Sequence, residues 1–412
     1  MTPNPWITLA IVVVTFIGIA IGRYPIIKSN RTTIALMGVA LLLAAGQIQF
    51  GDLPGYLDFD TLILLFSMMI INANLKLAGF FDLAGEALMR LTHTPRALLA
   101  LEIVLAGVLS ALFLNDTICL MFAPLILGLM DSLKRNPLPY LVALATAANV
   151  GSVATLTGNP QNMIIGTASG ITYLNFAAAL APIALLGLGI IWLVIVRMYP
   201  YEFDRKLRFT PMENTSKAIV WPLLWKTLAV TAGLLIAFLA GANIALASFI
   251  AANILMITRR NQPHMIFAEI DWSLLVFFAG MFIVSGSLET SGVTRELVDL
   301  NSLAQGANVL NLTGVTAVLS NLISNVPAVL LLKPVVASMA DPRIGWLTAA
   351  AASTLAGNLT LLGSVANLIV AETASRWRVE ISFWEYTKSG LIITLVTLAI
   401  AVLWLTLAVS IK

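Results

Sequence analysis

The chain has 412 residues, of which 59% are hydrophobic and only 10% are charged. A soluble domain carries roughly 25% charged residues, so this composition excludes a soluble protein and predicts an integral membrane protein. The single cysteine excludes a disulfide within the chain and a cysteine-cluster metal site, and two histidines in polar loops do not suggest a catalytic metal. The net charge of +3 comes from loop residues and gives no sign of nucleic-acid binding.

The apolar segments predict an all-α polytopic protein. Most of them are about 18–27 residues long, which fits helices that cross roughly 30 Å of hydrocarbon, and their weak alternation argues against a β-barrel. The first segment lacks a cleavage pattern and a basic n-region, so we expect a retained helix. In chain order the expected spans are 5–22, 33–50, 61–79, 97–130, 140–165, 172–198, 218–239, 244–257, 272–288, 309–340, 346–371 and 383–409. Two amphipathic connectors, 75–91 and 288–304, are expected to lie along the membrane interface.

Four of these segments are interrupted by polar residues, and the interruptions recur in pairs. Asn115 and Pro124 recur as Asn325 and Pro334 at a constant separation of 210 residues. A second set recurs at a separation of 205 residues and pairs Thr155 with Thr360, Gly158 with Gly363 and Asn162 with Asn367. Ordered matches of this kind predict two homologous halves. We expect the first repeat at 1–200, with a hairpin at 97–132 and a broken helix at 140–166. A linker would follow at 201–217, and then the second repeat at 218–412, with a hairpin at 309–340 and a broken helix at 346–371.

The basic residues predict the topology. If each hairpin enters and leaves on one side, each half has five crossings, so the second repeat is inverted. Placing both termini outside the cytoplasmic (inner) membrane leaves only Arg295, Lys333, Arg343 and Lys412 toward the outer side, in agreement with the positive-inside rule. Two full crossings per hairpin would also give an odd number, but polar tips in mid-segment favour re-entrant hairpins.

The polar interruptions are the predicted binding site. Broken helices free backbone groups where there is no water, and such groups are tolerated where they line a solute or ion site. The candidates are Asn115, Asp116, Thr117, Thr155, Thr157, Gly158, Asn159, Gln161, Asn162, Ser324, Asn325, Asn358, Thr360, Gly363, Ser364 and Asn367. The alternative is that the amides and hydroxyls only join helices by hydrogen bonds, and that Asp116 is only a helix cap. Cys119 is either a soft ligand for trivalent arsenic or an apolar packing residue.

The tips and broken helices resemble those of the ion transporter superfamily over nearly the whole chain. Asn115-Asp116-Thr117 and Ser324-Asn325-Val326-Pro327 resemble its Ser-Asn-Thr hairpin signature. The segments 158–162 and 357–367 are most similar to the branch of arsenite efflux permeases and pink-eyed-dilution proteins. The resemblance implies a scaffold, a transport domain that moves as an elevator, and a homodimer. It also implies a soluble ATPase partner if the chain is an arsenite pump.

The hypothesis that follows is a transporter and not an enzyme, because no catalytic cluster is visible. A carboxylate at Asp116 would repel a dianion, whereas dicarboxylate carriers of the superfamily usually have neutral tips. The best single interpretation is proton-coupled efflux of arsenite or antimonite. The alternatives are a dicarboxylate or other anion carrier, and a Na⁺/H⁺ antiporter with Na⁺ at Asn115, Asp116 and Asn325. The coupling ion is H⁺ or Na⁺, and no cofactor is expected.

Lys76 and Glu102 are expected to be solvated near the inner interface, and Lys333 to reach the outer surface.

Overall fold

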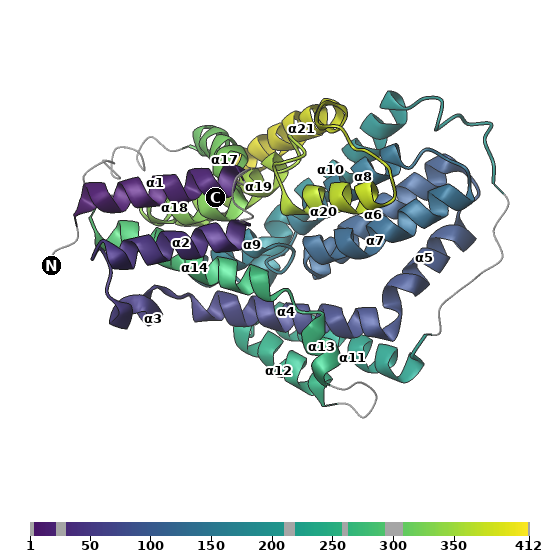
Figure 1. Cartoon of the computed structure of the whole chain (residues 1–412). Helices are drawn as coiled ribbons and strands as arrows, with labels where there is room; N and C mark the ends of the chain where they lie inside the picture. The colour runs from purple at the N-terminus through teal and green to yellow at the C-terminus, as the bar shows by residue number, and fades with distance from the viewer. Residues whose placement is uncertain (1–3, 22–29, 210–218, 258–262, 293–307, 411–412) are drawn as a thin grey trace.

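A computed structural model describes residues 4–21, 30–209, 219–257, 263–292 and 308–410. Within these ranges every regular element is a helix (Figure 1). Six of the described helices are long and apolar enough to cross a membrane: α4 (Phe59–Ala78), α6 (Pro95–Leu112), α10 (Tyr173–Met198), α11 (Trp221–Leu239), α14 (Trp272–Thr290) and α21 (Phe383–Ser410). This confirms the predicted all-α membrane class.

The remaining helices are shorter, and several of them are the arms of interrupted segments. Outside the interruptions lie α1 (Pro5–Ile21), α2 (Arg31–Ala44), η1 (Phe50–Asp52), α3 (Leu53–Tyr56), α5 (Phe80–Leu91), α12 (Ile244–Met256) and α13 (Pro263–Ala268). Two of these, α2 and α5, depart from the expected span and connector, and a glycine explains where each of them ends or begins.

Helix α2 ends six residues before the end of the span expected at 33–50. Gly46 has a φ of +66° and the amide of Gln47 donates to Leu42 O at 2.9 Å, which is a glycine-based helix stop. The expected connector at 75–91 is likewise two helices, because Gly79, at a φ of +85°, ends α4 and α5 starts immediately afterwards. Helix α5 packs against α4, α6 and α7. Most of the matching connector, 288–304, lies outside the described residues.

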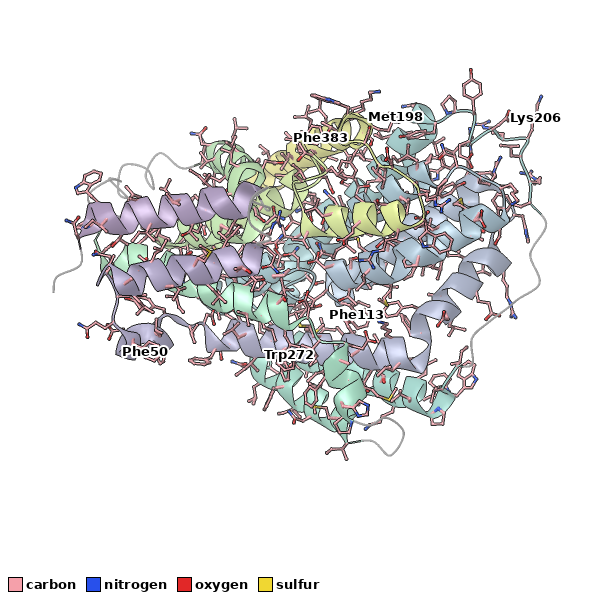
Figure 2. All side chains as sticks on the ribbon, in the orientation of Figure 1. Phe50, Phe113, Met198, Lys206, Trp272 and Phe383 are labelled. Atoms are coloured by element: carbon pink, nitrogen blue, oxygen red, sulfur yellow. The ribbon has the colours of Figure 1, made fainter. Side chains whose placement is uncertain are left out.

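Two interrupted segments form pairs of helices with short breaks. The first pair is α6 and α7 (Asn115–Ser132), and the second is α17 (Val309–Ile323) and α18 (Asn325–Ala337). Phe113, at the first break, is buried between the helices (Figure 2). The second break is Ser324 alone, with φ +80° and ψ 158°, a conformation almost restricted to glycine.

The other two interrupted segments have longer breaks. Residues 153–159 separate α8 (Leu138–Ser152) from α9 (Pro160–Ser169), and residues 357–364 separate α19 (Pro342–Ala356) from α20 (Val365–Arg376). Helix α7 packs against α20, and α18 packs against α9, so the second arm of each pair contacts a broken helix from the other half. The breaks therefore meet in the middle of the molecule, while α2 packs on α14, α12 on α4, and α11 on both α4 and α12.

Candidate functional site

The two broken helices are stabilised by the same pair of side-chain bonds. The Nδ2 of Asn162 donates to Ser152 O at 3.0 Å and to Thr155 O at 2.9 Å. The Nδ2 of Asn367 donates to Gly357 O at 2.8 Å and to Thr360 O at 3.1 Å. Each amide thus satisfies carbonyls that the interruption leaves without helical partners. The acceptors are separated by 205 residues, as the two asparagines are.

Polar residues also cap the helices that restart after the breaks. The Oδ1 of Asn159 accepts from the amide of Asn162 at 2.9 Å, and Pro160 occupies the first turn of α9. The Oγ of Ser364 accepts from the amide of Ala366 at 3.3 Å. Asn and Ser are preferred caps, and proline is favoured in the first turn. These residues therefore fix where α9 and α20 begin.

Gly158 and Gly363 allow backbone segments to approach closely at the breaks. A Cβ on Gly158 would lie 2.3 Å from Ser152 O, and one on Gly363 would lie 2.8 Å from Gly357 O. The carbonyl of Gly158 in addition accepts from the backbone amide of Asn115 at 3.0 Å. A side chain at Gly158 would therefore disturb both the break and the start of α7.

Asn149, on α8, joins one hairpin tip to the broken helix of the other half. Its Oδ1 accepts from Asn115 Nδ2 and from Ser364 Oγ, both at 3.0 Å. Its Nδ2 donates to Asn358 Oδ1 at 2.9 Å and to Asn367 Oδ1 at 3.0 Å. All five side chains are buried, so the amides compensate for one another in an apolar interior.

Thr354, on α19, has the corresponding position in the second half, 205 residues after Asn149. Its Oγ1 accepts from Asn159 Nδ2 at 3.2 Å and from Gln161 Nε2 at 3.1 Å. Sequence reasoning missed both Asn149 and Thr354, because each lies within an uninterrupted apolar helix. Extending the 205-residue separation to every polar residue of these helices would have found them.

A cavity of about 850 Å³, called the first cavity below, opens beside this network. Of the predicted site residues, Asn115, Asp116, Gln161, Ser324, Asn325 and Ser364 line it. The Oδ1 atoms of Asn115 and Asn325 are buried and have no hydrogen-bond partner. Each acceptor therefore lacks a protein partner, and a solute in the cavity would reach it once the hairpin tip moves.

The other predicted residues lie away from the first cavity. Thr155, Thr157, Gly158, Asn159, Asn162, Asn358, Thr360, Gly363 and Asn367 belong to the two breaks and their hydrogen bonds. Thr117 lines a small cavity of about 120 Å³ with Asn72, whose Nδ2 donates to Thr117 Oγ1 at 3.3 Å. The structure thus separates most candidates into residues that line a cavity and residues that hold the breaks, while Asn115 and Ser364 do both.

The charges around the first cavity are mostly negative. Among the described residues that line it, the acids are Asp116, Asp271 and Glu372, and the one basic residue is Arg31. No ion pair within 4.0 Å joins these four side chains in the described part of the chain. Asp271 caps α14 by accepting from the amide of Leu274 at 3.0 Å. Asp116 has no such cap bond, since α7 begins without one.

Two further sequence interpretations can be compared with the structure. Cys119 is buried one turn after the tip and lines neither the first nor the small cavity. No group of three or more metal-binding side chains occurs among the described residues.

The expectation of a solvated Glu102 was wrong: it is completely buried on α6, and neither carboxylate oxygen has a partner. The charge pattern did not predict this burial, because Glu102 lies two turns inside α6 and faces other helices.

Comparison with known proteins decides the family. Residues 16–356 match the model of the CitMHS family, described as citrate transporter. The chain belongs to the CitMHS family. The silicon efflux transporter LSI3 of Oryza sativa subsp. japonica is 32% identical over 92% of this chain and 93% of its own length. An uncharacterized transporter of Mycobacterium tuberculosis, Rv2684, is 30% identical over 96% and 98%. A Dictyostelium discoideum transporter named arsB is 25% identical over 97% and 92%.

The fold has a solved counterpart. The YdaH transporter of Alcanivorax borkumensis superposes with a TM-score of 0.62 at 16% identity and covers 99% of both chains. These similarities confirm the resemblance to the ion transporter superfamily. This member of the CitMHS family is a multi-pass membrane transporter. The hairpin-tip residues Asn115, Asp116 and Asn325, which line the first cavity, are the candidates for solute binding.

Proposed function

We propose that the protein exports a small uncharged hydroxide of a metalloid, with arsenous acid as the best single candidate, in exchange for protons. The observation that carries this proposal is the composition of the first cavity. Three carboxyl groups and one guanidinium line it together with neutral amides and hydroxyls. Such a lining favours a neutral, hydrogen-bonding solute over a multivalent anion.

Electrostatics disfavour a dianion at the hairpin tip. Two like unit charges 4 Å apart repel by roughly 4 kcal/mol at an effective dielectric constant of about 20. Arg31 offsets part of this repulsion, but it forms no ion pair with Asp116 among the described residues. A neutral solute avoids the repulsion altogether.

The polar lining complements a molecule that carries several hydroxyl groups. A hydroxyl both donates and accepts, as the amides of Asn115, Gln161 and Asn325 and the hydroxyls of Ser324 and Ser364 do. When the hairpin tips move, the unpartnered Oδ1 atoms of Asn115 and Asn325 would accept from the solute. Arsenous and silicic acids share this chemistry, and one relative is named a silicon efflux transporter.

Asp116 is the proposed site of proton coupling. It lies in the first turn of α7 and lines both the first cavity and the small cavity, which it shares with residues of α4 and α14. A carboxyl group there can bind a proton on one side of the membrane and release it on the other. We propose that α6–α9 and α17–α20 move together as an elevator against α1, α2, α4, α11, α12 and α14. A Na⁺ ion held by Asn115, Asp116 and Asn325 is the alternative form of coupling.

The second candidate function is transport of citrate or another organic anion. The family description favours it, as does the presence of Arg31 in the cavity. In that case Asp116 would carry a proton whenever the anion binds. The two candidates differ in the charge of the solute, which a transport assay can resolve.

The test uses purified protein in liposomes under an imposed pH gradient, with and without Na⁺. Uptake is measured for arsenite, antimonite and silicic acid, and separately for citrate and succinate. The proposal expects gradient-driven movement of the uncharged hydroxides and none of the carboxylates. Movement of the carboxylates alone would establish the second candidate, and a requirement for Na⁺ without a response to pH would replace proton coupling by Na⁺ coupling.

A further inference from the structure

A separate cavity of about 740 Å³, called the second cavity below, lies outside the site described so far. Helix α2 starts at the first cavity with Arg31, and the turn that follows it lines the second cavity with Gln47. Helix α14 starts at the first cavity with Asp271 and reaches the second with Glu289. Because α2 and α14 pack against each other, the two cavities lie at opposite ends of this helix pair. Figure 1 shows them side by side.

The barrier between the cavities is about one helical turn thick. Each of three helices lines the first cavity with one residue and the second cavity with another residue one turn further on. The pairs are Phe278 and Phe282 on α14, Val326 and Leu330 on α18, and Gln161 and Ile164 on α9. The members of a pair are three residues apart on α9 and four apart on α14 and α18, which corresponds to a rise of about 5–6 Å. The three helices thus agree on where the barrier lies and how thick it is.

The barrier is apolar apart from its edge. Phe278, Phe282, Val326, Leu330 and Ile164 are all buried. The rings of Phe278 and Phe282 lie 6.2 Å apart between centroids. Apolar constrictions of this kind exclude water and polar solutes until their walls separate. Helix α18 carries Asn325 at its start, so the wall and the hairpin tip belong to one rigid element.

The second cavity is itself suited to a hydrated polar solute. Asp52, Asp58, Glu289 and Lys333 line it, together with the amides of Gln47 and Gln49. Ser285 also lines it, and its buried Oγ has no hydrogen-bond partner. Lys333, expected to reach the outer surface, faces this cavity.

We infer that the two cavities are the two vestibules of one solute pathway, and that the constriction formed by α9, α14 and α18 is its gate. The pathway runs along one face of α14, from the hairpin tips past Phe278 and Phe282 to Ser285. This inference goes beyond the proposed function, because it holds for any polar solute. Its failure would leave the solute and the coupling ion as proposed.

Cysteine accessibility tests the two vestibules. Single cysteines are introduced in a Cys119→Ala background as Ser273→Cys in the first cavity and Thr290→Cys in the second, because both residues line their cavity and are exposed. Membrane-impermeant thiol reagents are then applied to right-side-out and to inside-out vesicles. Because Cys119 is buried, the natural background serves equally well if Cys119→Ala does not fold.

The expected result is that the two cysteines are labelled from opposite sides of the membrane. Ser287→Cys is the matched control: it lies about one turn before Thr290, is buried, bonds to Val284 O and does not line the cavity, so it should remain unlabelled. Labelling of both test positions from one side, or no labelling of Thr290→Cys from either side, would overturn the inference.

The gate is tested by leakage. Phe282→Ala removes one wall of the constriction and should raise solute leak through reconstituted vesicles, measured without a gradient, by about tenfold. Val276→Ala, on the exposed side of the same helix, should leave the leak unchanged. An equal leak in both variants would show that the solute does not pass Phe282.

Discussion

Asn149 connects the two halves of the chain through its side-chain amide. Four hydrogen bonds link it to Asn115, Ser364, Asn358 and Asn367. Removing the Asn149 amide leaves its buried partners without a hydrogen bond, and each group left in this way lowers the free energy of unfolding by about 1–3 kcal/mol. We expect Asn149→Leu to lower the unfolding temperature markedly and to abolish transport. Thr146→Val is the control, because the Thr146 hydroxyl bonds only to carbonyls of its own helix. Thermal unfolding in detergent measures both variants.

The cavity-lining asparagines should behave differently from those that hold the breaks. Asn325→Ala removes an amide that faces the first cavity, so it should weaken solute binding with little change in stability. Asn162→Ala frees two buried carbonyls and should lower stability as well as transport. Parallel measurements of thermal unfolding and solute affinity distinguish them, and the same profile for both variants would contradict the division.

Asp116 should be required for proton-driven transport. We expect Asp116→Asn to abolish transport driven by a pH gradient while solute binding is retained, because an amide cannot carry a proton between the two sides. Asp131→Asn, on the exposed far end of the same helix, is the control. A vesicle flux assay under the gradient measures both. Full activity of the Asp116 variant would reduce that residue to a helix-start residue without a coupling role.

At the scale of elements, the breaks of the two hairpins differ. The first has two extended residues before α7, whereas the second is the single residue Ser324 in a conformation that costs a non-glycine residue about 1–3 kcal/mol. Ser324→Gly should therefore raise the free energy of unfolding by about 1 kcal/mol. Ser338→Gly, at an ordinary φ of −93°, should not. Chemical denaturation in mixed micelles compares them, and destabilisation by Ser324→Gly would mean that the hydroxyl outweighs the strain.

The breaks are the part of the fold that the sequence predicts best. Polar residues in apolar segments mark them, and α7 and α18 begin at Asn115 and Asn325. The residues that bond to the breaks, Asn149 and Thr354, were harder to predict, because each is a single polar residue in an apolar helix. Their role becomes visible only in the structure, where each bonds to the broken helix of the other half. Glu102 shows the same limit, since spacing from a loop does not reveal which way a helix faces.

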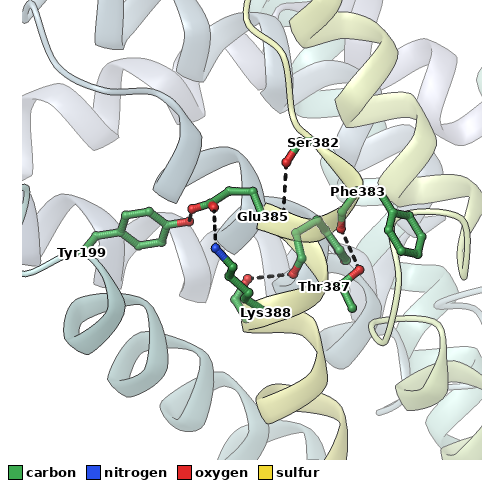
Figure 3. A network of polar contacts seen from close by, with 8 residues as sticks. Tyr199, Ser382, Phe383, Glu385, Thr387 and Lys388 are labelled. Carbon is green, nitrogen blue, oxygen red and sulfur yellow. Dashed lines mark hydrogen bonds and ion pairs between the residues drawn. The ribbon is translucent and has the colours of Figure 1, made fainter.

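At the scale of the whole molecule, polar contacts place two helix ends on one side. The hydroxyl of Tyr199, just after α10, donates to Glu385 Oε1 at 2.9 Å near the start of α21, and Lys388 approaches Glu385 Oε2 at 3.5 Å (Figure 3). Burial of the Tyr199 ring, followed by this bond to Glu385, raises the pKa of its hydroxyl. The contact holds the end of α10 beside the start of α21, and the assignment of this side to the cytoplasm stays a prediction.

The predicted orientation can be measured directly. Epitopes attached at the two termini should be accessible from outside the cell, whereas an epitope inserted after Asp204 should be accessible only after permeabilisation. The physical reason is the excess of basic residues on the cytoplasmic side. Accessibility of the Asp204 epitope in intact cells would reverse the predicted orientation.

The amide network of Asn149 has a consequence for biogenesis. Its partner Asn358 is synthesised 209 residues later, which at roughly 5–20 residues per second is a delay of about 10–40 s. During that interval the Nδ2 group of Asn149 lacks both of its acceptors, Asn358 and Asn367. A ribosome stalled between the two halves should therefore hold a loosely packed, protease-sensitive intermediate, and the arrival of α19 and α20 should make it resistant.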